Sequence, residues 1–159
     1  MIREELVAYL LRISQGKLLL VNHLLKITQQ QSKALEEEDI KILEDLVQEK
    51  QGIMEKIDVL DKEFMDKYSL IKEELGIENL QQYEGEVSET FKELKEKIAV
   101  IFKVIEEVHD LDQENTKKVK NNIAKSQQNI KSIKTGKRAL AGYNQPYKES
   151  HSFFIDKKK

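Results

Sequence analysis

The 159-residue chain contains no cysteine and no tryptophan, and Pro146 is its only proline. Without cysteine, neither a disulfide framework nor a thiolate metal site can form. Apolar runs are short, as at residues 18–21, and a run of that length cannot span a bilayer. The first residues lack the basic start, the apolar run and the small-residue cleavage site of a secretory signal. We therefore expect a cytoplasmic protein with no stable membrane insertion.

Motifs for catalysis and cofactor binding are also lacking. None of the six glycines forms a Gly-x-Gly-x-x-Gly or Walker pattern, and no Gly-x-Ser-x-Gly turn occurs. Glu106 and His109 form one Glu-x-x-His motif, but di-iron bundles need two such motifs and two further glutamates. Neither His23 nor His151 has a glutamate at that offset. We predict no enzymatic activity, no metal site and no cofactor, and we interpret His109 as a solvated residue on a helix face.

Helical periodicity is what the sequence has in abundance. Apolar residues recur at steps of three and four, which predicts one helix from about Arg3 to about Glu36 and a second from Ile40 to Leu75. Asp39 is suited to cap the start of the second helix, and Gly76 to end it. The short connection and the similar lengths, about 50 Å each, predict an antiparallel hairpin.

A third helix is predicted from Val87 onwards. Its apolar heptads continue to Leu111, after which polar residues such as Asp112 and Asn115 fall on core positions. The expected buried residues of the second and third helices are Leu43, Leu46, Ile53, Ile57, Leu60, Ile98, Ile101 and Ile105. The predicted fold is all-α: an elongated antiparallel bundle of three long helices in residues 1–141, followed by an irregular tail.

The third helix would exceed the hairpin in length. Continued to Leu140 it would span roughly 80 Å, so its final 30 residues would have no partner of equal length in the chain. An apolar stripe persists there among lysines, which favours residues 112–141 as a helix completed by another protein. The predicted binding residues are Val119, Ile123, Ile130, Ile133 and Leu140.

Charge is distributed unevenly along the chain. Residues 1–116 contain 15 basic and 27 acidic residues, whereas residues 117–159 contain 12 basic and 2 acidic residues. Such asymmetry predicts an interaction surface. The acidic first part argues against nucleic acid as the partner, and the lack of Trp and Phe in the stripe argues against a membrane surface.

Aromatic residues gather in the predicted tail, residues 142–159. Tyr143, Tyr147, Phe153 and Phe154 are four of the ten aromatic residues in the chain. An inert disordered tail is normally poor in aromatic residues. The composition therefore favours a flexible segment with a binding role.

The chain resembles the FlgN family of flagellar export chaperones. The resemblance is carried by Ala-Leu-Glu-Glu-Glu-Asp-Ile at residues 34–40, by Leu43, Leu46, Val47 and Glu49-Lys50 after it, by Asn115, and by the ending Ser-Phe-Phe-Ile-Asp-Lys-Lys at residues 152–158. It implies a helical bundle that binds the C-terminal helices of hook–filament junction proteins and delivers them to the export gate. It also implies that a tail tyrosine docks at the gate, with Tyr143 the first choice and Tyr147 the second.

Three other interpretations remain open on the sequence. The chain could be a related type III secretion chaperone with other cargo, or a structural coiled-coil protein that assembles with itself. A nucleic-acid binder is the third alternative. For a flagellar export chaperone we expect a monomer or a weak homodimer.

Overall fold

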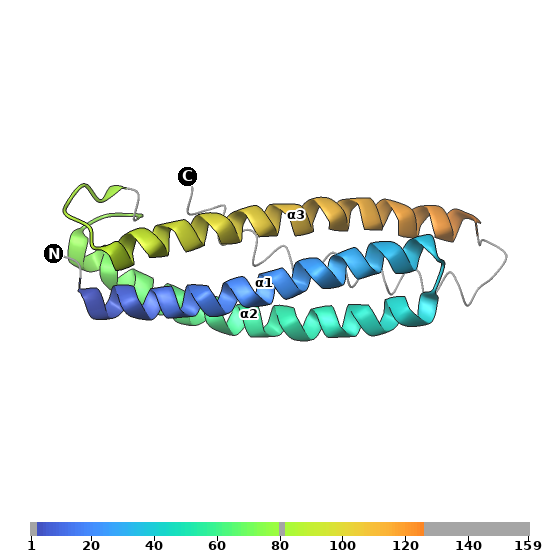
Figure 1. The fold of residues 1–159 in the computed structure, drawn as a ribbon, viewed down its shortest axis with the longest axis horizontal. Coiled ribbons are helices and arrows are strands. Elements are labelled where there is room, and N and C mark those ends of the chain that lie inside the picture. The colour runs from blue at the N-terminus through green and yellow to red at the C-terminus, as the bar shows by residue number, and fades with distance from the viewer. Residues whose placement is uncertain (1–2, 80–81, 126–159) are drawn as a thin grey trace.

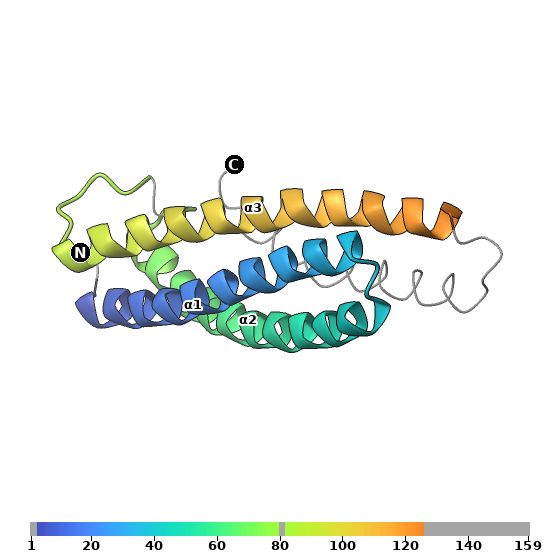
Figure 2. The same ribbon diagram turned by 45° about the vertical axis from the view of Figure 1, so that its right-hand side comes forward.

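The computed structural model describes residues 3–79 and 82–125, which fold into three long helices (Figure 1). They are α1 (Glu4–Glu36), α2 (Ile40–Leu75) and α3 (Glu89–Lys125). Helices α2 and α3 both pack along α1, and the two views in Figures 1 and 2 show one elongated bundle. The all-α prediction is confirmed, and no strand occurs among the described residues.

The helix ends follow from short-range chemistry. The Asp39 carboxylate accepts a hydrogen bond from the Ile42 backbone N–H at 3.2 Å, which confirms Asp39 as the cap of α2. Gly76 ends α2 in the left-handed conformation, with φ of 65°, as glycine does without a steric penalty. Helix α3 begins two residues later than predicted, because the Ser88 hydroxyl accepts a hydrogen bond from the Phe91 N–H and caps it there.

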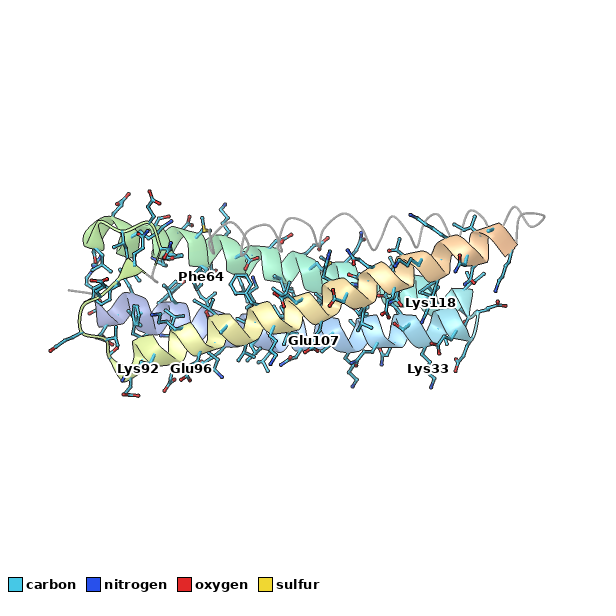
Figure 3. The ribbon with its side chains drawn as sticks, turned by 90° about the horizontal axis from the view of Figure 1, so that it is seen from above. Lys33, Phe64, Lys92, Glu96, Glu107 and Lys118 are labelled. Atoms are coloured by element: carbon cyan, nitrogen blue, oxygen red, sulfur yellow. The ribbon has the colours of Figure 1, made fainter. Side chains whose placement is uncertain are left out.

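Apolar side chains from all three helices form two clusters along the bundle. In the end cluster, Val7, Leu10 and Ile13 of α1 meet Phe64, Tyr68 and Ile71 of α2 and Phe91 and Leu94 of α3. Figure 3 shows Phe64 between the helices, whereas Lys92, Glu96 and Glu107 lie on outer faces. The main cluster extends from Val21 to Leu35 in α1, from Leu43 to Ile57 in α2 and from Ile101 to Val119 in α3.

The predicted core agrees with this packing in most positions. Six of the eight residues are buried; Leu60 and Ile98 are only partly buried and pack against the end cluster. In the described residues, no helix has a stretch long and apolar enough to cross a membrane.

Leu94 provides a direct test of the end cluster. Its side chain is 0% exposed, so Leu94→Ala removes buried apolar atoms and leaves a cavity. We expect the free energy of unfolding to fall by about 2–5 kcal/mol in urea titration. The matched control is Leu19→Ala, which removes the same atoms from a side chain that is 73% exposed. Equal losses in the two variants would contradict the proposed packing.

Candidate binding surface and buried polar layer

The predicted binding stripe begins inside the bundle. Val119 is only 1% exposed and belongs to the main cluster, so the interpretation that it lacks a partner within the chain is wrong. Asp112 and Asn115 are buried as well, which extends the packed core well past Leu111. Ile123 is partly buried and packs against the same cluster. The remaining predicted site residues lie outside the described residues: Ile130, Ile133, Leu140, Tyr143 and Tyr147.

The closed end of the hairpin fixes where α3 begins to project. The Lys118 ammonium lies 3.2 Å from the carboxylate of Glu36, the last residue of α1. Helix α3 continues for seven more residues to Lys125, a further length of about 10 Å. Figure 1 shows this end of α3 reaching beyond the turn between α1 and α2. The length mismatch therefore begins near Lys118 in the structure, and not at Leu111.

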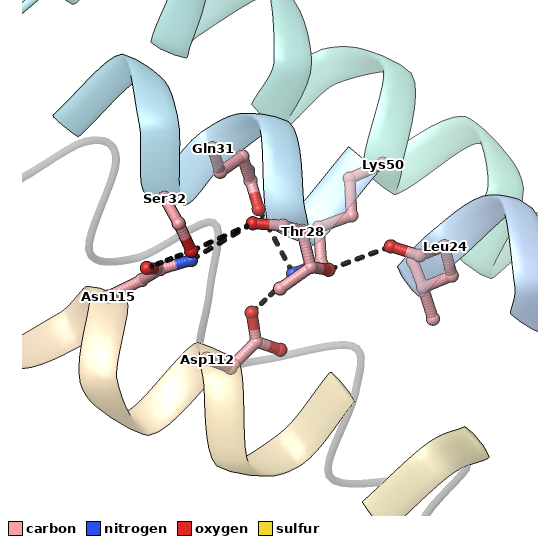
Figure 4. A network of polar contacts seen from close by, with 7 residues as sticks. All are labelled: Leu24, Thr28, Gln31, Ser32, Lys50, Asp112 and Asn115. Carbon is pink, nitrogen blue, oxygen red and sulfur yellow. Dashed lines mark hydrogen bonds and ion pairs between the residues drawn. The ribbon is translucent and has the colours of Figure 1, made fainter. Parts of the chain in front are cut away.

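A polar layer crosses the main cluster where all three helices meet (Figure 4). The Lys50 ammonium of α2 forms a buried ion pair with the Asp112 carboxylate of α3. It also donates a hydrogen bond to the Gln31 side-chain oxygen of α1 at 3.2 Å. Lys50 is 1% exposed, so its charge is withdrawn from water. We call this ion pair and its neighbours Gln31, Thr28, Ser32 and Asn115 the polar layer.

Asn115 ties α3 to α1 in the same layer. Its amide nitrogen donates to the Thr28 backbone oxygen at 3.2 Å, and its side-chain oxygen accepts from the Ser32 hydroxyl at 2.7 Å. Thr28 turns its own hydroxyl to the Leu24 backbone oxygen at 2.8 Å. Asn115 is thereby satisfied on both of its polar atoms, as a buried amide requires.

Burial disfavours the charged forms of both Lys50 and Asp112. It lowers the pKa of Lys50 and raises the pKa of Asp112, in each case against the attraction of the partner. Two buried atoms of the layer, Asp112 Oδ2 and Gln31 Nε2, have no hydrogen-bond partner among the described residues. A buried ion pair that is incompletely hydrogen-bonded adds little net stability, although removing one partner alone is costly.

A second buried ion pair joins Lys17 of α1 to Asp61 of α2. It lies between the end cluster, which reaches Ile13 and Phe64, and the main cluster, which starts at Val21 and Ile57. Burial lowers the pKa of Lys17 to about 8, against the opposing attraction of Asp61.

This shift predicts a pH dependence of stability. Between pH 8 and 10.5 the folded chain has released the Lys17 proton and the unfolded chain still holds it. The unfolded state then binds more protons, so the contribution of Lys17 to stability rises with pH in this window. We expect urea unfolding from pH 8 to 10.5 to show the wild type gaining stability relative to Lys17→Met. The variant Lys26→Met, at an exposed position of α1, is the control for loss of one positive charge. Parallel curves for wild type and Lys17→Met would contradict the prediction.

Neither buried lysine was predicted from the sequence, although a signal for both was present. Lys50 occupies the heptad position between Leu46 and Ile53, and Lys17 occupies the equivalent gap between Ile13 and Val21. A lysine on an apolar stripe, combined with an acid such as Asp112 on the stripe of another helix, indicates a buried pair.

The single Glu-x-x-His motif lies on the outside of α3. Glu106 is exposed, and the His109 ring contacts the Gln113 amide at 3.1 Å. Residues 3–79 and 82–125 contain no group of three or more side chains that could hold a metal ion.

The described residues define an all-α protein, an elongated three-helix bundle in which one helix projects past a hairpin. The chain belongs to the FlgN family, because the sequence model of that family, described as FlgN protein, matches residues 1–150. This is a family of flagellar export chaperones. Comparisons with curated proteins and with solved structures gave no match.

Proposed function

We propose that this chaperone acts in the cytoplasm on flagellar hook–filament junction proteins. It would bind their C-terminal helical region, prevent their premature assembly and deliver them to the flagellar type III export apparatus. The family match over residues 1–150 is the observation that carries the proposal, since it covers the bundle and most of the basic C-terminal part. A chaperone of exported subunits has to meet its cargo before export, which supports the cytoplasmic location.

The cargo surface is proposed on the C-terminal third, residues 112–141. Packing within the bundle covers Val119 and part of Ile123, so the accessible part of the stripe begins at the projecting end of α3. In the sequence the stripe continues with Ile130, Ile133 and Leu140. Val119 could contact cargo only if the last turns of α3 separated from the hairpin.

The chemistry of this stripe favours an amphipathic helix as the occupant. A helix of the cargo can lay its apolar face on the isoleucine stripe, as in helix-in-groove recognition. Residues 117–159, which include the lysines around the stripe, contain 12 basic and 2 acidic residues and are therefore strongly positive. Acidic side chains beside the apolar face of the cargo would therefore speed encounter and set its orientation.

The tail is proposed to act after cargo binding. Tyr143 and Tyr147 are the residues we assign to docking at the export gate. A chain that ends at residue 141 should still co-purify with junction proteins from a flagellated host, because the cargo stripe is intact. It should fail to support their secretion, measured as junction protein in the culture medium.

Single substitutions refine that test. Tyr143→Ala is expected to reduce secretion more than Tyr147→Ala, and neither should alter the amount of cargo that co-purifies. His151→Ala in the same tail is the control. Absence of junction proteins from the co-purified material would contradict the proposed cargo, whereas normal secretion by the shortened chain would contradict only the role of the tail.

A further inference from the structure

The apolar stripes alone do not define how far α3 is placed along the hairpin. Apolar residues of α3 that are buried or partly buried repeat in heptads at Phe91, Ile98 and Ile105, and in the interleaved series Leu94, Ile101 and Val108. A displacement by one heptad would put Ile98 in the place of Phe91 and Ile105 in the place of Ile98. Cores accept such exchanges among apolar residues when patterning is kept.

Such a displacement of α3 would disrupt the polar layer. One heptad of displacement puts Asp112 in the place of Ile105 and Asn115 in the place of Val108, both within the main cluster. Lys50 would then face Val119 in place of a carboxylate. Burying two separated charges is far more costly than exchanging one aliphatic side chain for another.

The connections between α1 and α2 and between α2 and α3 differ in how far they allow the helices to shift along the bundle. Residues 37–39 join α1 to α2, and three residues cannot absorb a displacement of about 10 Å, the length of one heptad. Residues 76–88 join α2 to α3, and these 13 residues can reach about 40 Å when extended. The hairpin register is thus fixed by its turn, whereas the position of α3 has to be fixed by contacts within the bundle.

We propose that the Lys50–Asp112 pair is a register-setting device that selects one longitudinal position of α3 on the hairpin. A single polar residue on an apolar seam fixes register in coiled coils in the same way. The register decides how far α3 projects past Glu36. That consequence for cargo rests on the proposed function, but the register itself is tested without cargo.

The test uses the absence of native cysteine. Glu36→Cys and Lys118→Cys place spin labels at the closed end of the hairpin and on α3, where the native side chains form a partly exposed contact. Pulsed electron-spin distance measurement on the full chain should give one distance. With Lys50→Leu and Asp112→Leu added, we expect at least one further population, displaced along α3 by about 10 Å.

A second buried pair supplies the matched control. Lys17→Leu with Asp61→Leu also replaces a buried ion pair by apolar side chains, but in the hairpin whose register the turn already fixes. It should keep the single native distance. The exchange Lys50→Asp with Asp112→Lys should also keep it, because the opposite charges still meet.

Three results would overturn the proposal. The first is a single native distance in the Lys50→Leu/Asp112→Leu chain. The second is an equal spread of distances in the Lys17→Leu/Asp61→Leu chain, which would make register loss a general effect of removing buried charge. The third is a Lys50→Leu/Asp112→Leu chain that does not fold, since the pair would then supply stability and not register.

Discussion

Asp112→Leu is expected to lower the free energy of unfolding by about 3–5 kcal/mol, the range for removing one partner of a buried ion pair. The reason is the charge left behind. The Lys50 ammonium lies among Gln31 and the apolar side chains of the main cluster, where its pKa is already lowered by burial. Without the carboxylate, the chain must keep an uncompensated charge in the core or release the proton.

Urea unfolding at neutral pH measures this loss of stability. Two further variants show whether the loss comes from the buried, unpaired charge. Asp110→Leu makes the same substitution at an exposed position of α3 and should change stability by only about 0.5 kcal/mol. Lys50→Leu combined with Asp112→Leu should recover most of the loss, because a buried pair replaced by apolar residues is often neutral. A loss in Asp112→Leu no larger than that in Asp110→Leu would show that the pair is not buried as described.

The features that could be predicted from the sequence are those determined by local interactions. The cap at Asp39 involves a backbone N–H three residues away, and the stop at Gly76 needs only a residue that tolerates positive φ. Heptad spacing likewise identified Ile53, Ile57, Ile101 and Ile105 as core residues. These signals are contained in a few consecutive residues, so one sequence is enough to see them.

The polar layer could not be found in that way. Lys50 and Asp112 are 62 residues apart, and although each lies on the apolar stripe of its helix, the spacing within one helix does not show that the two side chains meet. The sequence predicts a core that thins after Leu111, with Asp112 and Asn115 on core positions, but it does not show what those polar residues contact. Asp112 and Asn115 interrupt the apolar stripe, and only the partners Lys50, Thr28 and Ser32 show that the interruption is buried. Once those polar groups are paired, the core continues to Val119.

The burial of Val119 within the bundle changes how the cargo surface is best tested. Ile123 packs partly against the main cluster, so a charge placed there would disturb the bundle as well as the stripe. Ile130→Asp with Ile133→Asp acts farther along the same sequence pattern, beyond the described core. We expect calorimetric titration with the C-terminal helix of a junction protein to show a loss of at least about 100-fold in affinity, since each buried isoleucine contributes about 1.5–3 kcal/mol.

The control places the same two charges off the stripe. In helical spacing, Gln128 and Ser132 fall on the side away from Ile130, so Gln128→Asp with Ser132→Asp changes net charge equally without removing apolar contact area. This variant should bind within a few-fold of wild type, with the modest weakening expected of charge alone. Both variants should unfold at the wild-type urea concentration, because the described core ends before these positions. Wild-type affinity in Ile130→Asp/Ile133→Asp would contradict the proposal that the stripe is the cargo surface. Equal weakening in both variants would show that charge, and not apolar contact, determines cargo binding.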